Sequence, residues 1–367
     1  MKIGVLKEQA PGERRVALVP GVVATLSATG VEVLVETGAG ARANFPDSTY
    51  DAQGAAVASR TEICREADVI VCVGPPDGLE PRRGQLLVGL LRPQERPEQL
   101  RAWARTGATV VSLDLLPRTL SRAQAMDALT SQATVVGYKA VLVAANAYGG
   151  YFPMLVTAAG TVRPASVLVL GAGVAGLQGM GTARRLGAVV TGYDVRPEAR
   201  EEVRSVGARF LDLPGGPDAG GTGGYARELT DEEREAQQQA LRTAIGDADV
   251  VITTAGVPGR RPPVLVTEEA IKEMRAGSVV VDTAAGPLGG NVALSKPDTT
   301  VVVDGVTIIG AGNLAATMPA AASTAYARNI LAILAHLCPG GEPRIDLTDE
   351  IQDAIVVAHE GELRHEC

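Results

Sequence analysis

A short glycine turn is the first feature of the chain whose residue types and spacing could do chemistry. Its three glycines follow the dinucleotide-binding pattern G-x-G-x-x-G and are Gly171, Gly173 and Gly176. An apolar segment, Val167 to Leu170, leads into the turn, and the next apolar segment, Val189 to Tyr193, ends in Asp194. We therefore predict that the turn admits a pyrophosphate to a helix N-terminus, where backbone N–H groups and the helix dipole favour an anion.

Asp194 also indicates which dinucleotide is bound. An acidic residue about twenty positions after the turn accepts hydrogen bonds from the adenosine ribose hydroxyls and repels a 2′-phosphate, which favours NAD(H) over NADP(H). Arg196, two residues further on, could instead pair with a phosphate. The alternative of a glycine turn without a ligand is disfavoured, because the preceding strand, the following helix and the acidic residue are all present.

A second polar cluster lies in the segment from Pro117 to Gln132. Gln124 and Asp127 are three residues apart, as are Asp127 and Thr130, so we expect them on one face of a helix that begins there. From spacing alone, capping of the helix N-terminus by acidic and amide side chains is the preferred explanation.

The charged segment from Lys7 to Leu18 directly follows the first predicted strand. Loops at the carboxyl ends of parallel strands line ligand crevices, so Arg15 could meet an anion, and a salt-bridged surface is an equally good explanation. The histidines lie in the last helix or the tail, at His336, His359 and His365. A histidine general base is therefore not expected, and this favours hydride transfer between two nicotinamides, which moves no proton at the site.

Composition excludes several classes of protein. The chain has 367 residues, 46% of them hydrophobic and 21% charged, which is typical of a globular protein of two or more domains. A net charge of -8 and an aromatic content of 3% argue against a nucleic-acid-binding protein. The four cysteines are scattered, so we expect reduced thiols and no metal site. Each long uncharged stretch contains glycine and either proline or a glycine turn, so we expect a soluble chain without direct membrane insertion.

Alternating apolar strands and amphipathic segments predict an α/β fold with two Rossmann-like, doubly wound parallel-sheet domains separated by a cleft. The first domain is expected at residues 1–128 with 318–367, and the NAD(H)-binding domain at 138–310. A helical segment within Arg118 to Ala147 would connect them. The glycine-rich segment from Pro214 to Tyr225 predicts a loop, either a lid over the cofactor or a disordered insertion.

The motifs together resemble the NAD(H)-binding domain I of proton-translocating nicotinamide nucleotide transhydrogenase. They are K-E-x-x-x-x-E-x-R-V-A-L at residues 7–18, P-R and S-R-A-Q-x-M-D-x-L-x-S-Q within 117–132, A-A-G-T-V-x-P-A at 158–165, G-A-G-V-A-G-L at 171–177 and G-G-Y-A at 223–226. Alanine dehydrogenase is the sister family and shares the opening motif and the glycine turn. Its substrate-binding lysine and histidine are replaced here by Gly74-Pro75-Pro76 and Gly89-Leu90-Leu91.

The resemblance implies roles for individual residues. It places a loop triad near the nicotinamide, consisting of Arg118, Gln124 and Asp127. Gln124 would orient the nicotinamide ring or its ribose, and the two charged residues would hold the loop. One extra residue stands between Arg118 and Ser121, so Arg122 is the alternative arginine, and Thr130 replaces the usual serine.

It also implies contacts along the dinucleotide. The residues at the pyrophosphate would be Val174, Ala175 and Gly176. Those on the adenosine side would be Asp194, Val195 and Arg196. Those of the lid and adenine region would be Gly224, Tyr225, Gln237 and Gly256.

The implied activity is direct hydride transfer from NADH to NADP⁺ held by the β subunit, which is the Re/Si-specific, proton-translocating type of transhydrogenase. The chain would be a homodimeric α1 subunit on the cytoplasmic side of the membrane, joined to it through the β subunit and a membrane-spanning α2 subunit. Two alternatives are a self-contained amino-acid dehydrogenase of the alanine dehydrogenase type and an NAD(H)-binding regulatory protein without catalysis.

Overall fold

The chain forms two compact units in a computed structural model that describes residues 1–214, 231–256 and 261–365. Unit 1 comprises Met1–Gln132 and Ala315–Cys367, and unit 2 comprises Ala133–Leu314. The helix α5 (Ala128–Ala147) begins in unit 1 and ends in unit 2, so the division falls inside one continuous helix. The cleft between the two domains stays a prediction.

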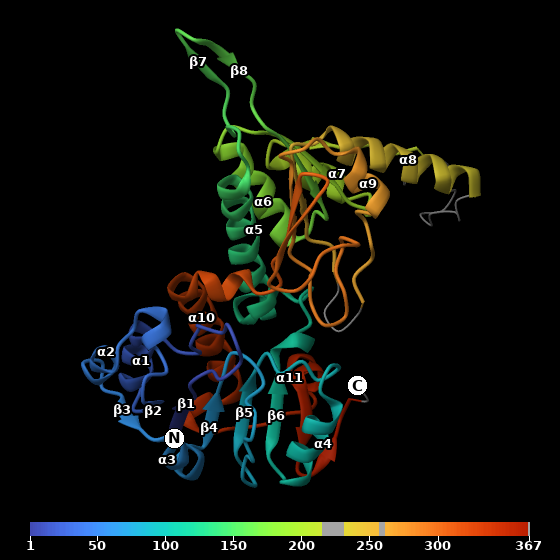
Figure 1. The fold of residues 1–367 in the computed structure, drawn as a ribbon. Coiled ribbons are helices and arrows are strands. Elements are labelled where there is room, and N and C mark those ends of the chain that lie inside the picture. Colours follow the sequence, from blue (N-terminus) through green and yellow to red (C-terminus); the bar gives the residue numbers. More distant parts are fainter. Residues whose placement is uncertain (215–230, 257–260, 366–367) are drawn as a thin grey trace. The chain divides into compact units, whose positions relative to one another are not determined.

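Unit 1 is built on an eight-stranded sheet in the order β17-β16-β6-β5-β4-β1-β2-β3 (Figure 1). The strands from β3 to β6 are all parallel, in the doubly wound order. The tail of the chain adds β16 antiparallel to β6, so the first domain is discontinuous in sequence. The strands are β1 (Lys2–Val5), β2 (Glu32–Glu36), β3 (Ala56–Ala58), β4 (Val69–Val71), β5 (Leu86–Gly89), β6 (Thr109–Ser112), β16 (Val356–His359) and β17 (Glu362–Leu363).

Helices cover both faces of this sheet because its strands are apolar on both sides. Along β2, Val33 and Val35 pack in one core with α1 and α10, whereas Leu34 belongs to a second core with α3 and α4. The α-helices are α1 (Pro20–Ser27), α2 (Asp47–Asp51), α3 (Arg60–Glu66), α4 (Pro97–Arg105), α10 (Pro319–Leu337) and α11 (Glu350–Ile355). Short 3₁₀ helices are η1 (Ala41–Ala43), η2 (Leu113–Leu115), η3 (Ser121–Met126), η4 (Leu314–Thr317) and η5 (Pro339–Gly341).

Unit 2 repeats the doubly wound order in a seven-stranded sheet, β11-β10-β9-β12-β13-β15-β14, in which only β14 is antiparallel to its neighbour. The strands of this sheet are β9 (Ser166–Leu170), β10 (Val189–Tyr193), β11 (Arg209–Phe210), β12 (Val250–Thr253), β13 (Val279–Asp282), β14 (Thr300–Val303) and β15 (Val306–Gly310). Besides α5, its helices are α6 (Val174–Arg185), α7 (Ala199–Ser205), α8 (Asp231–Asp247) and α9 (Glu268–Glu273). The predicted fold class is thus confirmed in both domains.

A two-stranded hairpin, β7 (Leu155–Thr157) and β8 (Gly160–Val162), extends away from the sheet of unit 2 (Figure 1). It was not predicted from the sequence, which shows only a break in the helical pattern there. Apolar side chains lie exposed on and beside it, among them Met154 and Val156, the latter 75% exposed. An isolated hairpin buries too little surface to be stable alone, so these side chains form a surface that favours a contact.

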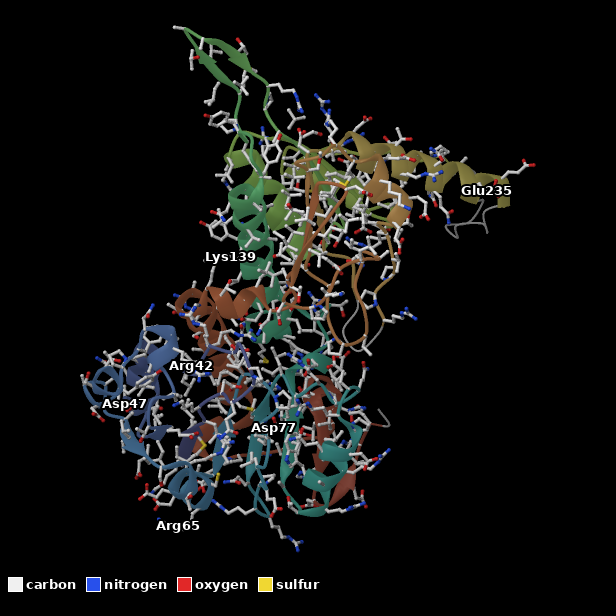
Figure 2. The ribbon with its side chains drawn as sticks, in the orientation of Figure 1. Arg42, Asp47, Arg65, Asp77, Lys139 and Glu235 are labelled. Atoms are coloured by element: carbon white, nitrogen blue, oxygen red, sulfur yellow. The ribbon has the colours of Figure 1, made fainter. Side chains whose placement is uncertain are left out.

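By length and composition, α5 is the one described helix that could cross a membrane, with a mean hydropathy of 1.2. Packing inside unit 2 accounts for its apolar character, because Ala140, Val141 and Ala144 are fully buried in the core around β9. Lys139 on the same helix carries a charge in this stretch (Figure 2).

Candidate functional site

The glycine turn joins β9 to α6 in a space too tight for side chains. Gly171 has a φ of 103°, and a Cβ atom there would lie 3.0 Å from the backbone nitrogen of Ala255. A Cβ on Gly176 would overlap the carbonyl oxygen of Gly171. Thr254 Oγ1 donates a hydrogen bond of 3.0 Å to that same carbonyl, so the segment after β12 is fixed to the turn.

The N-terminus of α6 fits an anionic group. Its N-cap is Gly173, and among the described residues no side chain caps the helix. A Cβ on Gly173 would meet nothing within 4 Å, so the space in front of the first helical N–H groups is open. These N–H groups, including those of Val174 and Ala175, are the donors that a dinucleotide pyrophosphate binds.

A close contact between α5 and this turn was not predicted from the sequence. A Cβ on Gly137 would overlap the carbonyl group of Ala175, so only glycine lets α5 pack this closely. A glycine in the middle of a long helical pattern is the signal that could have indicated it. The contact supports the turn from the side opposite β12.

Asp194 lies beside the glycine turn, as predicted. Its carboxylate accepts hydrogen bonds from Ala172 N at 2.7 Å and from Arg196 N at 2.9 Å, which orients it at the carboxyl end of β10. The Arg196 guanidinium donates to Asp194 at 3.2 Å and to Glu202 at 3.3 Å. Arg196 is therefore held by two carboxylates, an arrangement that favours a ribose hydroxyl at Asp194 over a 2′-phosphate at Arg196.

A cavity of about 880 Å³ lies next to the carboxyl end of β10. Val195 and Gln237 both line it, so the structure brings together two residues that the resemblance placed at the adenosine and adenine. Thr267 and Glu235 also line it, and Figure 2 shows Glu235 on α8. Gly256 is exposed, and a Cβ there would meet nothing within 4 Å. Gly224 and Tyr225 lie outside the described residues, as does most of the predicted loop.

The second polar cluster forms a hydrogen-bonded network in unit 1. Arg118 Nε donates to Asp127 Oδ2 at 3.0 Å, and Arg118 Nη2 donates to Thr130 Oγ1 at 2.8 Å. Asp127 also accepts from the backbone and hydroxyl of Thr130, at 2.8 and 2.6 Å. Burial alone would raise the pKa of Asp127, but the hydrogen bonds from Thr130 and Arg118 hold it below its usual range. Asp127 is therefore an ionised cap of α5.

The expectation that Gln124, Asp127 and Thr130 share one helical face was wrong. The chain forms the 3₁₀ helix η3 up to Met126, and Asp127 has a ψ of 86°, which breaks the path before α5 begins. Asp127 prefers the N-cap, where its carboxylate binds the Thr130 N–H, over a place inside a helix. Asp127 is consequently buried, whereas Gln124 is exposed.

The two candidate arginines have different partners. Arg118 binds Asp127, whereas Arg122 Nη1 lies 2.6 Å from Asp349 at the N-terminus of α11. Asp349 also lies 3.1 Å from His336 Nε2, so Arg122 holds η3 to the tail of the chain. Of the two, Arg118 has the contacts that the implied loop triad requires.

Arg15 takes part in a buried ion pair, so the salt-bridged explanation of the charged loop holds, although not at the surface. Its Nε and Nη2 donate to the two carboxylate oxygens of Glu13 at 2.8 and 2.7 Å. Its Nη1 donates to Gln132 Oε1 at 2.8 Å, and Gln132 in turn donates to the carbonyl of Ala322. Arg15 thus ties the loop after β1 to α5 and α10.

Glu8 in the same loop is a buried carboxyl, bonded to Val73 N at 2.6 Å and Gly74 N at 3.3 Å. Burial raises its pKa from 4.5 to about 7. Because the folded-state pKa is the higher one, this group favours folding below about pH 4.5 and loses that contribution as the pH rises through 7.

We therefore expect Glu8→Gln to remove a pH dependence. The unfolding free energy of the parent, relative to the variant, should fall by about 3 kcal/mol between about pH 4.5 and about pH 8. Urea unfolding across this range measures it, with the exposed Glu80→Gln as a control. Parallel pH profiles for the parent and Glu8→Gln would contradict the prediction.

Two domain models match the chain from one end to the other. The N-terminal domain of alanine dehydrogenase/PNT matches residues 4–136, and the C-terminal domain matches residues 140–366. The chain belongs to the alanine dehydrogenase/PNT family. The predicted recognition and NAD(H) as the cofactor of the family are thereby confirmed.

Named relatives narrow the comparison. The chain is 43% identical to NAD(P) transhydrogenase subunit alpha of Cereibacter sphaeroides, over 98% of this chain and 70% of the relative. It is 37% identical to NAD(P) transhydrogenase subunit alpha of Haemophilus influenzae, over 99% of this chain and 71% of the relative. The solved transhydrogenase of Sinorhizobium meliloti has a TM-score of 0.86 at 38% identity, covering 100% of this chain and 99% of that one. A solved L-alanine dehydrogenase is more distant, with a TM-score of 0.80 at 28% identity, covering 100% and 97%.

Proposed function

We propose that this chain binds NADH and passes its hydride directly to NADP⁺ held by a partner subunit, as the NAD(H)-binding α subunit of a proton-translocating transhydrogenase. The observation that carries the proposal is the network around Asp127. It fixes the segment of Gln124 with groups that are already ionised and hydrogen-bonded, and it leaves Gln124 itself exposed. Such residues can orient a nicotinamide, and hydride transfer between two nicotinamides requires orientation without a proton acceptor.

In unit 2, the chain's own residues would hold the rest of the dinucleotide. The N–H groups at the start of α6 would bind the pyrophosphate, and Asp194 would accept from the adenosine ribose hydroxyls. The cavity lined by Val195 and Gln237 would take the adenine. NADH supplies the hydride when bound, and the protein supplies position and the preference for NAD(H).

The proposed partners follow from the relatives' naming as subunit alpha. We assign the NADP(H)-binding domain to a β subunit and the attachment to the membrane to that subunit and a membrane-spanning α2 subunit. This chain would be the cytoplasmic, peripheral part of the complex. The exposed apolar hairpin β7–β8 supports a homodimer, because a second copy could cover Met154 and Val156.

The rival is a self-contained amino-acid dehydrogenase of the alanine dehydrogenase type. The positions that would carry its substrate-binding lysine and histidine do not support it. The N–H of Gly74 is bound by Glu8, Leu91 is buried in the core, and a Cβ on Gly89 would lie 2.8 Å from the carbonyl oxygen of Cys72. No pocket for an oxo acid is needed for transfer between two nucleotides.

The experiment that separates these functions is a mixing assay with the purified chain. We expect NADH to reduce an NADP⁺ analogue rapidly only when this chain and the NADP(H)-binding domain of the β subunit are both present. The same chain should not oxidise NADH with pyruvate and ammonium. Oxidation with pyruvate and ammonium would establish the dehydrogenase instead, and NADH binding without either reaction would indicate a regulatory protein.

A further inference from the structure

We propose that Asn291 is a positioning residue of the NADH site, holding the segment after β12 in the place where it meets the glycine turn. This residue is fully buried and was not singled out by the sequence. The inference rests on the NADH site proposed above, and it concerns cofactor binding rather than hydride transfer.

The side-chain amide of Asn291 makes three hydrogen bonds to backbone groups. Its Oδ1 accepts from Ala255 N at 3.1 Å, and its Nδ2 donates to the carbonyl oxygens of Ala255 and Pro263, both at 2.8 Å. Both N–H donors and the carbonyl acceptor of the amide are thus used. Only an amide of this length can bind the N–H and the C=O of Ala255 together and still reach Pro263.

The backbone of Asn291 is itself held in two directions. Its carbonyl oxygen accepts from Leu265 N at 2.8 Å and Val266 N at 3.0 Å. The next residue, Val292, donates its N–H at 3.2 Å to Asp282, a fully buried carboxylate at the carboxyl end of β13. Asp282 also accepts from Thr253 Oγ1, the last residue of β12, at 3.1 Å. Asn291 therefore acts from a rigid base.

The segment that Asn291 holds is in contact with the glycine turn. Thr254 Oγ1 donates to the carbonyl of Gly171, and Ala255 N is so close to Gly171 that a side chain there would not fit. A shift of Ala255 would move Gly171 and the open space in front of α6, where the pyrophosphate is expected. The position of the cofactor therefore depends on Asn291, although its amide is occupied by the backbone.

Asn291→Ala tests this role, because it leaves three buried backbone groups without partners. We expect NADH binding to the chain alone to weaken about tenfold to a hundredfold, measured by titration of NADH fluorescence. Asn291→Asp, which keeps one acceptor and loses both donors, should weaken binding as well. Thr254→Val removes only the hydroxyl donation to Gly171 and should weaken binding by a smaller factor, about threefold to tenfold.

Gln85→Ala is the matched control, because Gln85 in unit 1 is also fully buried and also makes three bonds from its amide to the backbone. It accepts from Arg82 N and donates to the carbonyls of Cys64 and Ala67. We expect Gln85→Ala to lower the melting temperature while NADH binding stays unchanged. Equal losses of binding in Gln85→Ala and Asn291→Ala would overturn the inference, as would unchanged binding in Asn291→Ala or, if that variant does not fold, in Thr254→Val.

NADH binding is measured without the β subunit. Binding that depends on Asn291 without hydride transfer would support this inference and contradict the proposed function. A parent chain that binds no NADH would contradict both.

Discussion

Gly173→Ala is expected to weaken NADH binding about tenfold to a hundredfold while leaving the fold intact, because one methyl group would stand where the pyrophosphate approaches the first N–H groups of α6. Gly173 has φ and ψ of -72° and -171°, which alanine adopts without strain. A Cβ there meets no other part of the described chain within 4 Å. The lost affinity would therefore report a clash with the ligand. Isothermal titration with NADH and the melting temperature together check this.

Gly181→Ala is the control on the same helix, since a Cβ at Gly181 would find its nearest atom, on Arg185, at 3.6 Å. It should bind NADH as the parent does. Gly173→Ala with unchanged affinity would show that the pyrophosphate does not lie at the start of α6, and the dinucleotide assignment of this turn would fail.

Gln124→Asn is expected to slow hydride transfer about a hundredfold and to change the affinity for NADH by much less. Shortening the side chain by one methylene moves its amide by about 1 Å, and misplacement of this size can cost about 10² in rate. Gln124 is exposed, and no hydrogen bond of its side chain is found among the described residues, so the structure assigns it no role in stability. Single-turnover transfer with the β subunit and NADH titration separate the two effects.

The exposed Gln53→Asn, on the outer part of unit 1, provides the corresponding control and should leave both quantities unchanged. Equal losses in binding and rate for Gln124→Asn would mean that Gln124 contributes affinity rather than orientation. A rate like that of the parent would remove Gln124 from the reaction.

The dinucleotide turn could be predicted because its chemistry is local. Three glycines, a strand before them and an acid after the next strand define the site within about twenty-five residues of sequence, and the structure places Asp194 against Ala172. Gly137 and Asn291 could not be predicted in the same way. They come from α5 and from the loop after β13, and only the packing of the sheet brings them to the turn.

The network in unit 1 shows a different limit. Helical spacing placed Gln124 and Asp127 on one face, but the preference of Asp127 for an N-cap breaks the helix between them. The contacts of Arg118 and Arg122 could not be separated from sequence either, because their partners lie nine and 227 residues away. Short strands such as β3 and β17 carry too few residues to show a period.

The transfer of deuterium from NADH to NADP⁺ tests the central claim most directly. NADH carrying deuterium at both C4 positions is mixed with this chain, the β subunit and NADP⁺, and the product is analysed by mass spectrometry. Direct transfer predicts NADPH with one deuterium per molecule and none released to water. Unlabelled NADPH, or deuterium in the solvent, would show that the hydrogen passes through an exchangeable group and would contradict the account.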